Sequence, residues 1–421
     1  MKHTLDSKTK IPIISWADEI DEKSLAQAKD LTELPFAHHH IALMPDVHAG
    51  YGMPIGGVLT ALDAIIPYAV GVDIGCGVKV IKTNLSVDDL SKERLRMVLN
   101  QIQRNVPTGF EHHKTPQESK IFKKVPEVEI IQKEFKSAQR QMGTLGGGNH
   151  FIEIQKGQDG GIWAMVHCGS RNLGKKVADF YHKKALEYDQ KNNLEYVNSE
   201  LAWLPLDSSF VDLTQLPHLG DENFYHPRGE RSPQLRKQSS RQTLDTALGR
   251  GYFEAMNFCL DFAHENREKV MDVVKNALGN KTEFEDNIHH NYASVETHFG
   301  KEAIIHRKGA IQAKKGQKVI VPGSMGTKSY VGKGLGEPDS FESCAHGAGR
   351  AMGRGEAKRK ITAEQVIEEM QVKNIELFKV KKHDVAEEAS AAYKNIDEVM
   401  EAQKDLVEIT DILEPLGVVK G

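Results

Sequence analysis

Apolar residues recur at helical spacing in several parts of the chain, and short β-rich runs lie between them. Helices are predicted after Ser86, where SVDD has the form of a capping box, and over residues 132–142, 173–190 and 242–278. Runs of β-branched residues bounded by glycines predict strands over 78–83, 162–168, 303–308 and 318–322. From about Thr362 the chain again alternates charged and apolar positions at helical spacing, before an apolar end, LGVVKG.

No repeat, low-complexity run or Pro/Ser-rich linker interrupts this pattern. The length of 421 residues would allow roughly three domains at about 150 residues each, but nothing in the composition forces a boundary. We therefore expect an α+β fold, a single large mixed α/β domain over residues 1–421, with glycine-rich loops converging on one site.

The composition is that of a soluble globular protein, with 39% hydrophobic and 27% charged residues. No stretch approaches the roughly 18 consecutive apolar residues of a membrane helix, and the N-terminus lacks the apolar segment of a signal peptide, so a cytoplasmic location is expected. The cysteines, Cys76, Cys168, Cys259 and Cys344, are too far apart for a CxxC pair. Any function of a cysteine must therefore come from residues assembled in space.

The net charge of −4 argues against a protein that binds nucleic acid over its whole surface. One local exception is the segment from Lys301 to Gly336, which holds eight basic residues and one acidic residue, Glu302. This segment is a candidate phosphate-facing surface, and an ordinary solvated face is the alternative.

Seven short segments, most of them rich in glycine, stand out, and all of them except PGSMGTKS carry a His, Cys, Asp or Asn in place of ordinary turn residues. Glycine lets the backbone approach a ligand closely and lets N–H groups point into one cavity. These segments are MPDVHAGYG (44–52), VGVDIGCG (70–77), GTLGGGNHF (143–151), VHCGSRNLG (166–174), HHNY (289–292), PGSMGTKS (322–329) and SCAHGAGR (343–350). We expect them to share one site.

Five side chains in these segments form a plausible set of metal ligands: Asp73, Cys76, His150, His167 and His290. Any one of them alone is more often structural, because a lone His is commonly a core or surface residue and a buried Cys behaves as a small hydrophobe. Together they exceed the four ligands of a closed zinc site, which favours two divalent cations bridged by the Cys. Paired metals are a recurrent device for phosphoryl chemistry.

Two further features favour a phosphate substrate. The strand, tight loop and helix around residues 162–190 have the order that places a helix N-terminus on an anion, and Arg171 adds a bidentate phosphate donor. His346, in the loop CAHGAGR, has small neighbours and could act as a nucleophile toward phosphorus, with a structural His as the alternative. Neither GxxxxGK[ST] nor GxGxxG occurs, so a standard P-loop or Rossmann protein is not expected.

Taken in order, these motifs resemble those of the RtcB RNA ligases, the GTP-dependent tRNA-splicing and RNA-repair ligases. The resemblance also includes RKGA and the terminal VVKG, and it spans roughly Met44 to Gly421. It implies a single catalytic domain that joins RNA 3′-phosphate or 2′,3′-cyclic phosphate ends to 5′-hydroxyl ends. The His matching His346 would attack the α-phosphate of GTP and pass the guanylyl group to the RNA 3′-phosphate.

The resemblance also implies roles for individual residues. Cys76 would bridge two Mn²⁺ ions, with Asp73 and His150 completing one site and His167 and His290 the other. Phosphates would be held by Asn149, Arg171 and Asn291, guanine would contact Glu153, Ser324 and Lys420, and its pocket would be lined by Phe151 and Tyr393. The expected partners are GTP and RNA with broken or spliced ends, and the need for an activating helper protein stays open.

The resemblance departs at Cys168, where the family more often has Ser, and we expect this change to place a second thiol beside the metals, where it would affect metal preference or sensitivity to oxidation. Residues 193–238 match no motif. Two other functions remain open at this point. One is a two-metal phosphoesterase or nuclease in which His346 only contacts phosphate, and the other is a non-catalytic RNA-binding protein.

Overall fold

The computed structural model describes residues 2–5, 8–194, 197–207, 246–279, 281–379 and 382–421. Its helices are α1 (Glu22–Thr32), α2 (Pro67–Val70), α3 (Lys92–Asn105), α4 (Glu129–Gln141), α5 (Arg171–Lys191), α6 (Ala247–Leu278), α7 (Arg354–Lys360), α8 (Ala363–Val372) and α9 (Ile396–Ala402). Its strands are β1 (His3–Thr4), β2 (Ile13–Ser15), β3 (Ala37–His48), β4 (Ile55–Ala61), β5 (Ala64–Ile65), β6 (Gly77–Ser86), β7 (Phe151–Gly157), β8 (Gly161–Cys168), β9 (Leu204–Pro205), β10 (Thr282–His289), β11 (Asn291–His298), β12 (Lys301–Lys308), β13 (Ala310–Gln312), β14 (Lys318–Val321), β15 (Ser329–Gly334), β16 (Ser343–Ala345), β17 (Glu376–Lys379) and β18 (Val407–Lys420).

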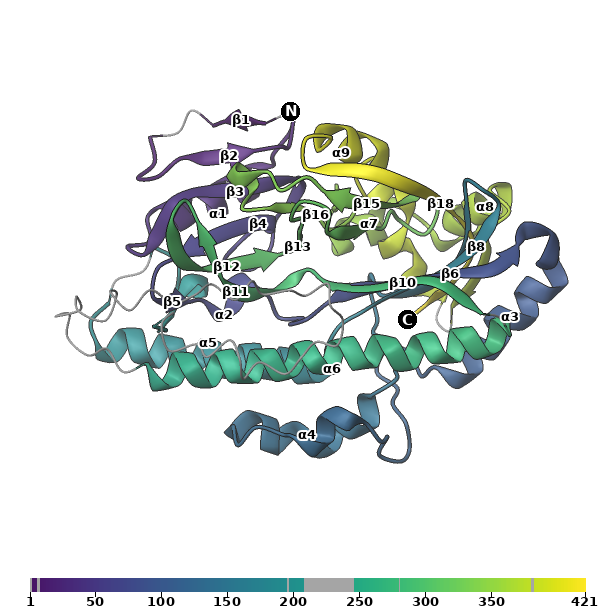
Figure 1. The fold of residues 1–421 in the computed structure, drawn as a ribbon, viewed down its shortest axis with the longest axis horizontal. Helices are drawn as coiled ribbons and strands as arrows, with labels where there is room; N and C mark the ends of the chain where they lie inside the picture. Colours follow the sequence, from purple (N-terminus) through teal and green to yellow (C-terminus); the bar gives the residue numbers. More distant parts are fainter. Residues whose placement is uncertain (1, 6–7, 195–196, 208–245, 280, 380–381) are drawn as a thin grey trace.

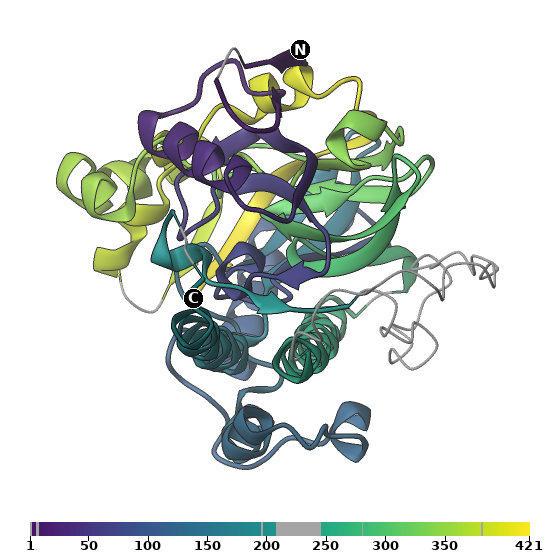
Figure 2. The same cartoon turned by 90° about the vertical axis from the view of Figure 1, so that its left-hand side faces the viewer.

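Two β-sheets lie above a layer of long helices (Figure 1). The six-stranded sheet has the order β1-β2-β3-β4-β12-β11, and the eight-stranded sheet has the order β10-β6-β8-β7-β18-β15-β14 with β17 beside β18. Figure 2 shows α5 and α6 end-on beneath the sheets, and α4 lies outside them. The expectation of a mixed α and β fold is confirmed.

The long helix α6 supports both sheets because one side of it is almost entirely apolar. Its fully buried residues include Tyr252, Phe262 and Val270. Burying a large apolar side chain stabilises a fold by roughly 1.5–3 kcal/mol relative to leaving it exposed. The helix ends where Gly279 adopts a left-handed conformation (φ 64°), which allows its N–H to bond the carbonyl of Lys275.

Most predicted elements are present. The helices expected at 132–142, 173–190 and 242–278 correspond to α4, α5 and α6, although residues 242–245 lie outside the described part of the chain. The four predicted strands correspond to parts of β6, β8, β12 and β14. The capping box at Ser86 caps only a short 3₁₀ turn, and α3 begins later, with the Ser91 side chain accepting a bond from the Arg94 N–H.

The helical reading of the C-terminal part is wrong in two places. Helices α8 and α9 follow the predicted spacing, but residues 376–379 and 407–420 are the strands β17 and β18. The 14-residue β18 pairs with both β7 and β15, in the middle of the eight-stranded sheet. Charged residues fall between its apolar ones with no clear period, so pairing with two neighbouring strands decides its conformation.

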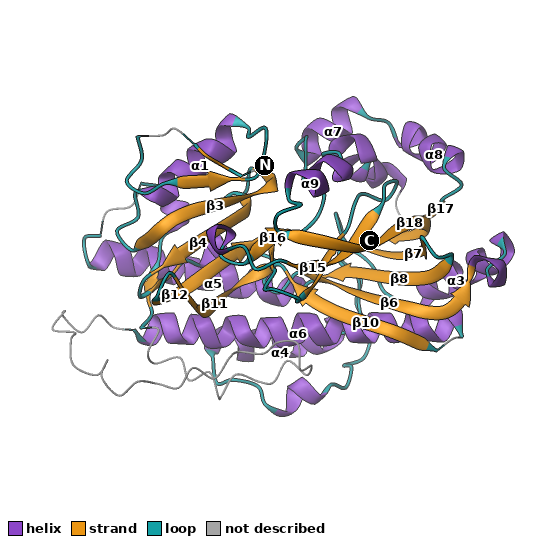
Figure 3. Cartoon of the chain, turned by 45° about the horizontal axis from the view of Figure 1, so that its top comes forward, coloured by secondary structure: helices purple, strands orange, loops and turns teal. Residues whose placement is uncertain are grey.

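One edge of the eight-stranded sheet brings several strand ends together (Figure 3). Gly77 at the start of β6 pairs with Cys168 at the end of β8 and with His289 at the end of β10. Phe151 at the start of β7 pairs with His167 and with Lys420 near the end of β18. Because these neighbours are antiparallel, residues just before β6 and β7 and near the ends of β8, β10 and β18 share this edge.

Candidate active site

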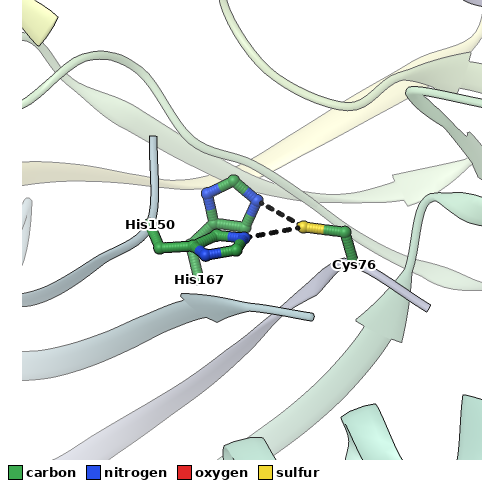
Figure 4. Close-up of side chains that lie close together, drawn as sticks. All are labelled: Cys76, His150 and His167. Carbon is green, nitrogen blue, oxygen red and sulfur yellow. Dashed lines mark hydrogen bonds between the residues drawn. The ribbon is translucent and has the colours of Figure 1, made fainter. Parts of the chain in front are cut away.

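Three of the proposed metal ligands meet at this edge. The Sγ of Cys76 lies 3.3 Å from Nε2 of both His150 and His167 (Figure 4). The Asp73 Oδ2 lies 3.0 Å from the same His150 nitrogen, and the His290 ring centroid is 5.2 Å from that of His167. A thiol, a carboxylate and imidazole nitrogens thus converge on one small volume, and this donor set suits a divalent cation.

Burial sets the protonation of these groups. It lowers the pKa of His167 and His290 well below the ordinary value, so both imidazoles are neutral and can act as ligands. Burial also raises the pKa of the Cys76 thiol, which then needs a nearby cation in order to ionise. Although burial opposes ionisation of Asp73, its hydrogen bond with His150 holds the pKa of that carboxyl below its usual range.

His346 lies directly after β16 and next to these residues. Its ring centroid is 4.7 Å from that of His290, and its Nδ1 lies 2.6 Å from the Asp46 Oδ2. The same carboxylate oxygen accepts bonds from the backbone N–H groups of His346 (3.1 Å) and Gly347 (3.3 Å). With Nδ1 held by a carboxylate, the ring nitrogen left for chemistry is Nε2.

Asp46 was not singled out by the sequence. It stands in MPDVHAGYG, a segment noted only for its glycines and its pattern, and it is fully buried at the end of β3. The carboxylate in that segment is the one available signal, but its partner lies 300 positions further along the chain. Only the fold brings the two together.

A cavity of about 1410 Å³ holds most of the site. Of the residues proposed from the sequence, those that line it are Asp73, Cys76, Asn149, Phe151, His167, His290, Asn291, Ser324, His346, Tyr393 and Lys420. His150 contacts Cys76 from behind this lining, and Glu153 is buried beneath it. The structure therefore places the proposed metal ligands, nucleophile and most nucleotide contacts around one space.

Arg171, which we expected to hold phosphate, lies beside the same glycine loops. It occupies the first position of α5 with a left-handed backbone (φ 58°). Its guanidinium donates to the Thr144 hydroxyl (2.9 Å) and to the carbonyl of Gly109 (2.6 Å). Two of its donors are therefore already engaged within the protein.

Another part of the cavity lining is organised by Glu388, which no motif indicated. This buried carboxylate accepts hydrogen bonds from the Tyr393 hydroxyl, from Lys420 Nζ (3.4 Å) and from Arg350 Nη1 (3.3 Å). Arg350 also donates to the Tyr393 hydroxyl at 3.0 Å. Burial disfavours the charged form of Glu388, but Lys420, Tyr393 and Arg350 together hold its pKa below the ordinary value.

Glu153 is a second buried carboxyl in this region, only 1% exposed. Burial raises its pKa to about 8, and the nearby Lys420 offsets this only in part. Gln155 donates to its Oε2 at 2.8 Å, whereas Oε1 has no hydrogen-bond partner among the described residues. A buried acceptor without a partner is a place where a ligand N–H can bind.

The basic segment from Lys301 to Gly336 is only partly a surface. Arg307 is fully buried and pairs with Glu296, with Nη2 3.0 Å from Oε2. Lys308 is also buried, and its Nζ donates to the carbonyls of Met53 (3.0 Å) and Tyr68 (3.1 Å). Burial lowers the pKa of Lys308 to about 7. These two residues are not part of a solvated basic face.

Comparison with known proteins identifies the family. A family model described as "tRNA-splicing ligase RtcB" matches residues 27–135, 117–213 and 232–421. The chain belongs to the RtcB family. It is 32% identical over 455 residues to the RNA-splicing ligase RtcB of Escherichia coli (strain K12), with 100% of both chains covered. It is 30% identical over 505 residues to the tRNA-splicing ligase RtcB of Nanoarchaeum equitans, covering 99% of this chain and 96% of the relative.

Cys168, the position where we expected this RtcB-family chain to depart from the family pattern, points away from the proposed metal ligands. Its Sγ accepts a bond from Asn266 Nδ2 (3.3 Å) and lies 3.5 Å from the carbonyl of Thr144. Burial raises the pKa of this thiol, so it stays protonated. Since successive strand residues face opposite sides, His167 and Cys168 cannot both face the cavity.

Of the stretch 193–238, which matches no motif, the structure describes only residues 193–194 and 197–207, where β9 pairs with β5. No helix in the described residues is long and apolar enough to cross a membrane.

Proposed function

We propose that this protein is a GTP-dependent RNA ligase that joins RNA 3′-phosphate or 2′,3′-cyclic phosphate ends to 5′-hydroxyl ends. The observation that carries the proposal is the position of His346. Its Nδ1 is held by Asp46, and its ring lies 4.7 Å from His290, in the cavity that the Cys and His cluster also lines. The names of the RtcB relatives, RNA-splicing and tRNA-splicing ligases, support RNA as the substrate.

In the first step Nε2 of His346 attacks the α-phosphate of GTP. A nitrogen–phosphorus bond forms, the bond from the α-phosphorus to the bridging oxygen breaks, and pyrophosphate leaves with its electron pair. Asp46 keeps the proton on Nδ1 and stabilises the positive charge that develops on the ring. Two Mn²⁺ ions, held by Asp73, Cys76, His150, His167 and His290, would offset the negative charge on the phosphate oxygens.

The part of the cavity around Glu388 and Lys420 would hold the nucleotide. Glu153 offers an unpartnered carboxyl oxygen to guanine N–H groups, and Lys420, Phe151 and Tyr393 stand near it in the same part of the lining. The other proposed contacts, Asn149, Asn291 and Ser324, line the same cavity, so the phosphates and the base would bind in one continuous space.

In the second step an RNA 3′-phosphate oxygen attacks the phosphorus of the guanylyl group, and His346 leaves with its nitrogen lone pair restored. The 5′-hydroxyl oxygen of the other RNA end then attacks the activated 3′-phosphate and displaces GMP. A 2′,3′-cyclic phosphate is first opened to the 3′-phosphate by water at the same site. We further propose that residues 1–421 carry these steps as one catalytic domain.

Incubation with α-labelled GTP and Mn²⁺ tests the proposal. The wild-type protein should acquire a label that acid removes and base does not, and His346→Ala should take none. His112→Ala, which changes an exposed histidine, is the control and should be labelled normally. Absence of label on the wild-type protein, together with opening of cyclic phosphates, would establish the two-metal phosphoesterase instead. RNA binding without either activity would establish a non-catalytic protein.

A further inference from the structure

Behind the metal-ligand cluster, α6 carries a fully buried arginine whose partners are all uncharged. Arg267 Nη1 donates to the carbonyls of Gly75 (2.9 Å) and Cys168 (2.8 Å). Its Nε donates to Asn287 Oδ1 at 2.6 Å, and its Nη2 lies 3.1 Å from His289 Nδ1. No carboxylate among the described residues is hydrogen-bonded to this guanidinium.

Three of these partners are the chain neighbours of proposed metal ligands. Gly75 precedes Cys76, Cys168 follows His167, and His289 precedes His290. One planar, rigid group therefore touches the segment before β6, the end of β8 and the end of β10. Because a guanidinium holds its donors in a fixed fork, it sets the distances between these segments as well as bonding each one.

Asn266, the residue before Arg267, holds the fourth segment, which leads to His150. Asn266 Oδ1 accepts bonds from the backbone N–H groups of Gly143 (2.7 Å) and Thr144 (3.1 Å), and its Nδ2 donates to the carbonyl of Thr144 (3.0 Å). This fixes the start of the glycine loop that leads to His150. Two adjacent residues of α6 thus contact every segment that carries a His or Cys of the cluster.

Burial of an unpaired guanidinium is unfavourable, so its retention in an apolar helix face needs a compensating benefit. Its hydrogen bonds satisfy the carbonyls of Gly75 and Cys168, and the carboxylates of Glu268 and Asp73 favour its charged form without being hydrogen-bonded to it. An apolar residue in its place would remove the Arg267 bond to the Cys168 carbonyl and would leave the Gly75 carbonyl with His289 Nδ1 (2.9 Å) as its remaining side-chain partner.

We propose that Arg267 is a positioning residue for the metal centre, which holds the segments bearing Cys76, His167 and His290 at the spacing that two divalent ions require. The inference rests on the metal site of the proposed function. It concerns the protein side of that site alone and assigns to α6 a role that none of the sequence motifs indicated.

Binding of Mn²⁺ to the full-length protein, measured by calorimetry and by the metal-induced rise in melting temperature, tests this role. Arg267→Lys keeps the charge but loses the fork, and it should weaken Mn²⁺ binding by roughly tenfold to a hundredfold, as changes next to metal ligands commonly do. Arg96→Lys, which alters a surface pair with Glu376, is the matched control and should bind as the wild type does.

A purely structural role gives a different result. It would lower the melting temperature of the metal-free protein and leave the rise on adding Mn²⁺ unchanged, and that outcome would overturn the proposal. If Arg267→Lys does not fold, Asn287→Ala removes the contact to Arg267 Nε, together with the bonds of Asn287 Nδ2 to Glu268 and to the carbonyl of His264, and keeps the buried cation. It should then bind Mn²⁺ more weakly by a few fold, and wild-type affinity would overturn the proposal.

Failure of this inference is distinguishable from failure of the proposed function. Wild-type affinity in Arg267→Lys would remove the role of Arg267 while GTP labelling of His346 stands. A wild-type protein that binds no divalent cation would overturn both.

Discussion

Two parts of the cavity lining differ in how they place charged groups: the metal side, which carries the proposed metal ligands, and the nucleotide side, which carries the proposed nucleotide contacts. On the metal side, neutral imidazoles, a thiol and a carboxylate face the cavity and a buried cation, Arg267, lies behind them. On the nucleotide side, the acidic groups are the buried carboxyl of Glu153 and the carboxylate of Glu388, which lines the cavity and pairs with Lys420. The first arrangement is suited to holding cations, and the second would present acceptors and charge to the proposed base and its phosphates.

The two sides also differ in what fixes them. The proposed metal ligands, apart from Asp73, stand at or beside strand ends, where strand pairing and contacts with α6 fix the backbone. The loss of one of these contacts should therefore displace several ligands at once. The nucleotide side depends on side-chain bonds to Glu388 from Arg350, Tyr393 and Lys420. We therefore expect changes on the metal side to abolish activity and changes on the nucleotide side to tune it.

The largest effect is expected for Cys76→Ala. Because its thiolate would bridge the two ions, both should be lost and GTP labelling should fall to background. His167→Ala should impair one ion more than the other. Metal content by mass spectrometry, measured alongside labelling, checks this, and equal partial losses in the two variants would show that Cys76 does not bridge.

Asp46→Asn should affect the proposed nucleophile, His346, and leave the metal ligands and the nucleotide contacts in place. The amide keeps the shape of the side chain but removes the charge that supports His346, so the labelling rate should fall by roughly 100-fold. Mn²⁺ content should not change. Glu398→Gln, an exposed carboxylate at the cavity rim, is the matched control, and a wild-type rate in Asp46→Asn would remove Asp46 from the mechanism.

Glu388→Gln should act on GTP affinity with little effect on metal content. Loss of the charge weakens the bonds that hold Arg350, Tyr393 and Lys420, and a loss of about 1.4 kcal/mol corresponds to a tenfold higher KM for GTP. The neighbouring Glu387→Gln, which loses a pair with Lys358, serves as control. If labelling kinetics show an unchanged KM, the nucleotide side does not depend on Glu388.

The pH dependence of stability should report on Glu153. Its pKa in the folded protein is about 8, above the ordinary value of 4.5, so between these values the folded protein keeps a proton that the unfolded chain releases. The free energy of unfolding should therefore fall as pH rises through this window, by at most about 1.4 kcal/mol per pH unit from this group. Urea unfolding at several pH values should give a flatter profile for Glu153→Gln, and identical profiles would contradict the assignment.

The smallest effect is expected on the solvated part of the basic segment. Lys315 and Lys333 are exposed, and reversing both charges should weaken RNA binding by a few fold and reduce its dependence on salt, since each neutralised phosphate releases counterions. GTP labelling without RNA should not change. RNA binding that does not depend on salt would remove this segment from the RNA-binding surface.

The sequence predicts the features that depend on near neighbours in the chain better than those that depend on distant ones. Local patterns predicted the strand, glycine loop and helix around His167 and the segments that meet at the cavity, because these depend on near neighbours in the chain. The pairing of Asp46 with His346 could not be predicted, because the two are 300 positions apart and neither spacing nor composition links them. Arg267 and Glu388 stand in ordinary amphipathic or charged stretches, and only their burial shows their roles.

The central position of β18 has a consequence for how the protein is made. Translation produces β18 after β7, β15 and β17, all of which pair with it, so the growing chain exposes the edges of β7 and β15 until this strand emerges. Unpaired strand edges promote aggregation. Slower synthesis at low temperature, or chaperones supplied during expression, should therefore raise the yield of soluble protein more than late addition of metal ions does.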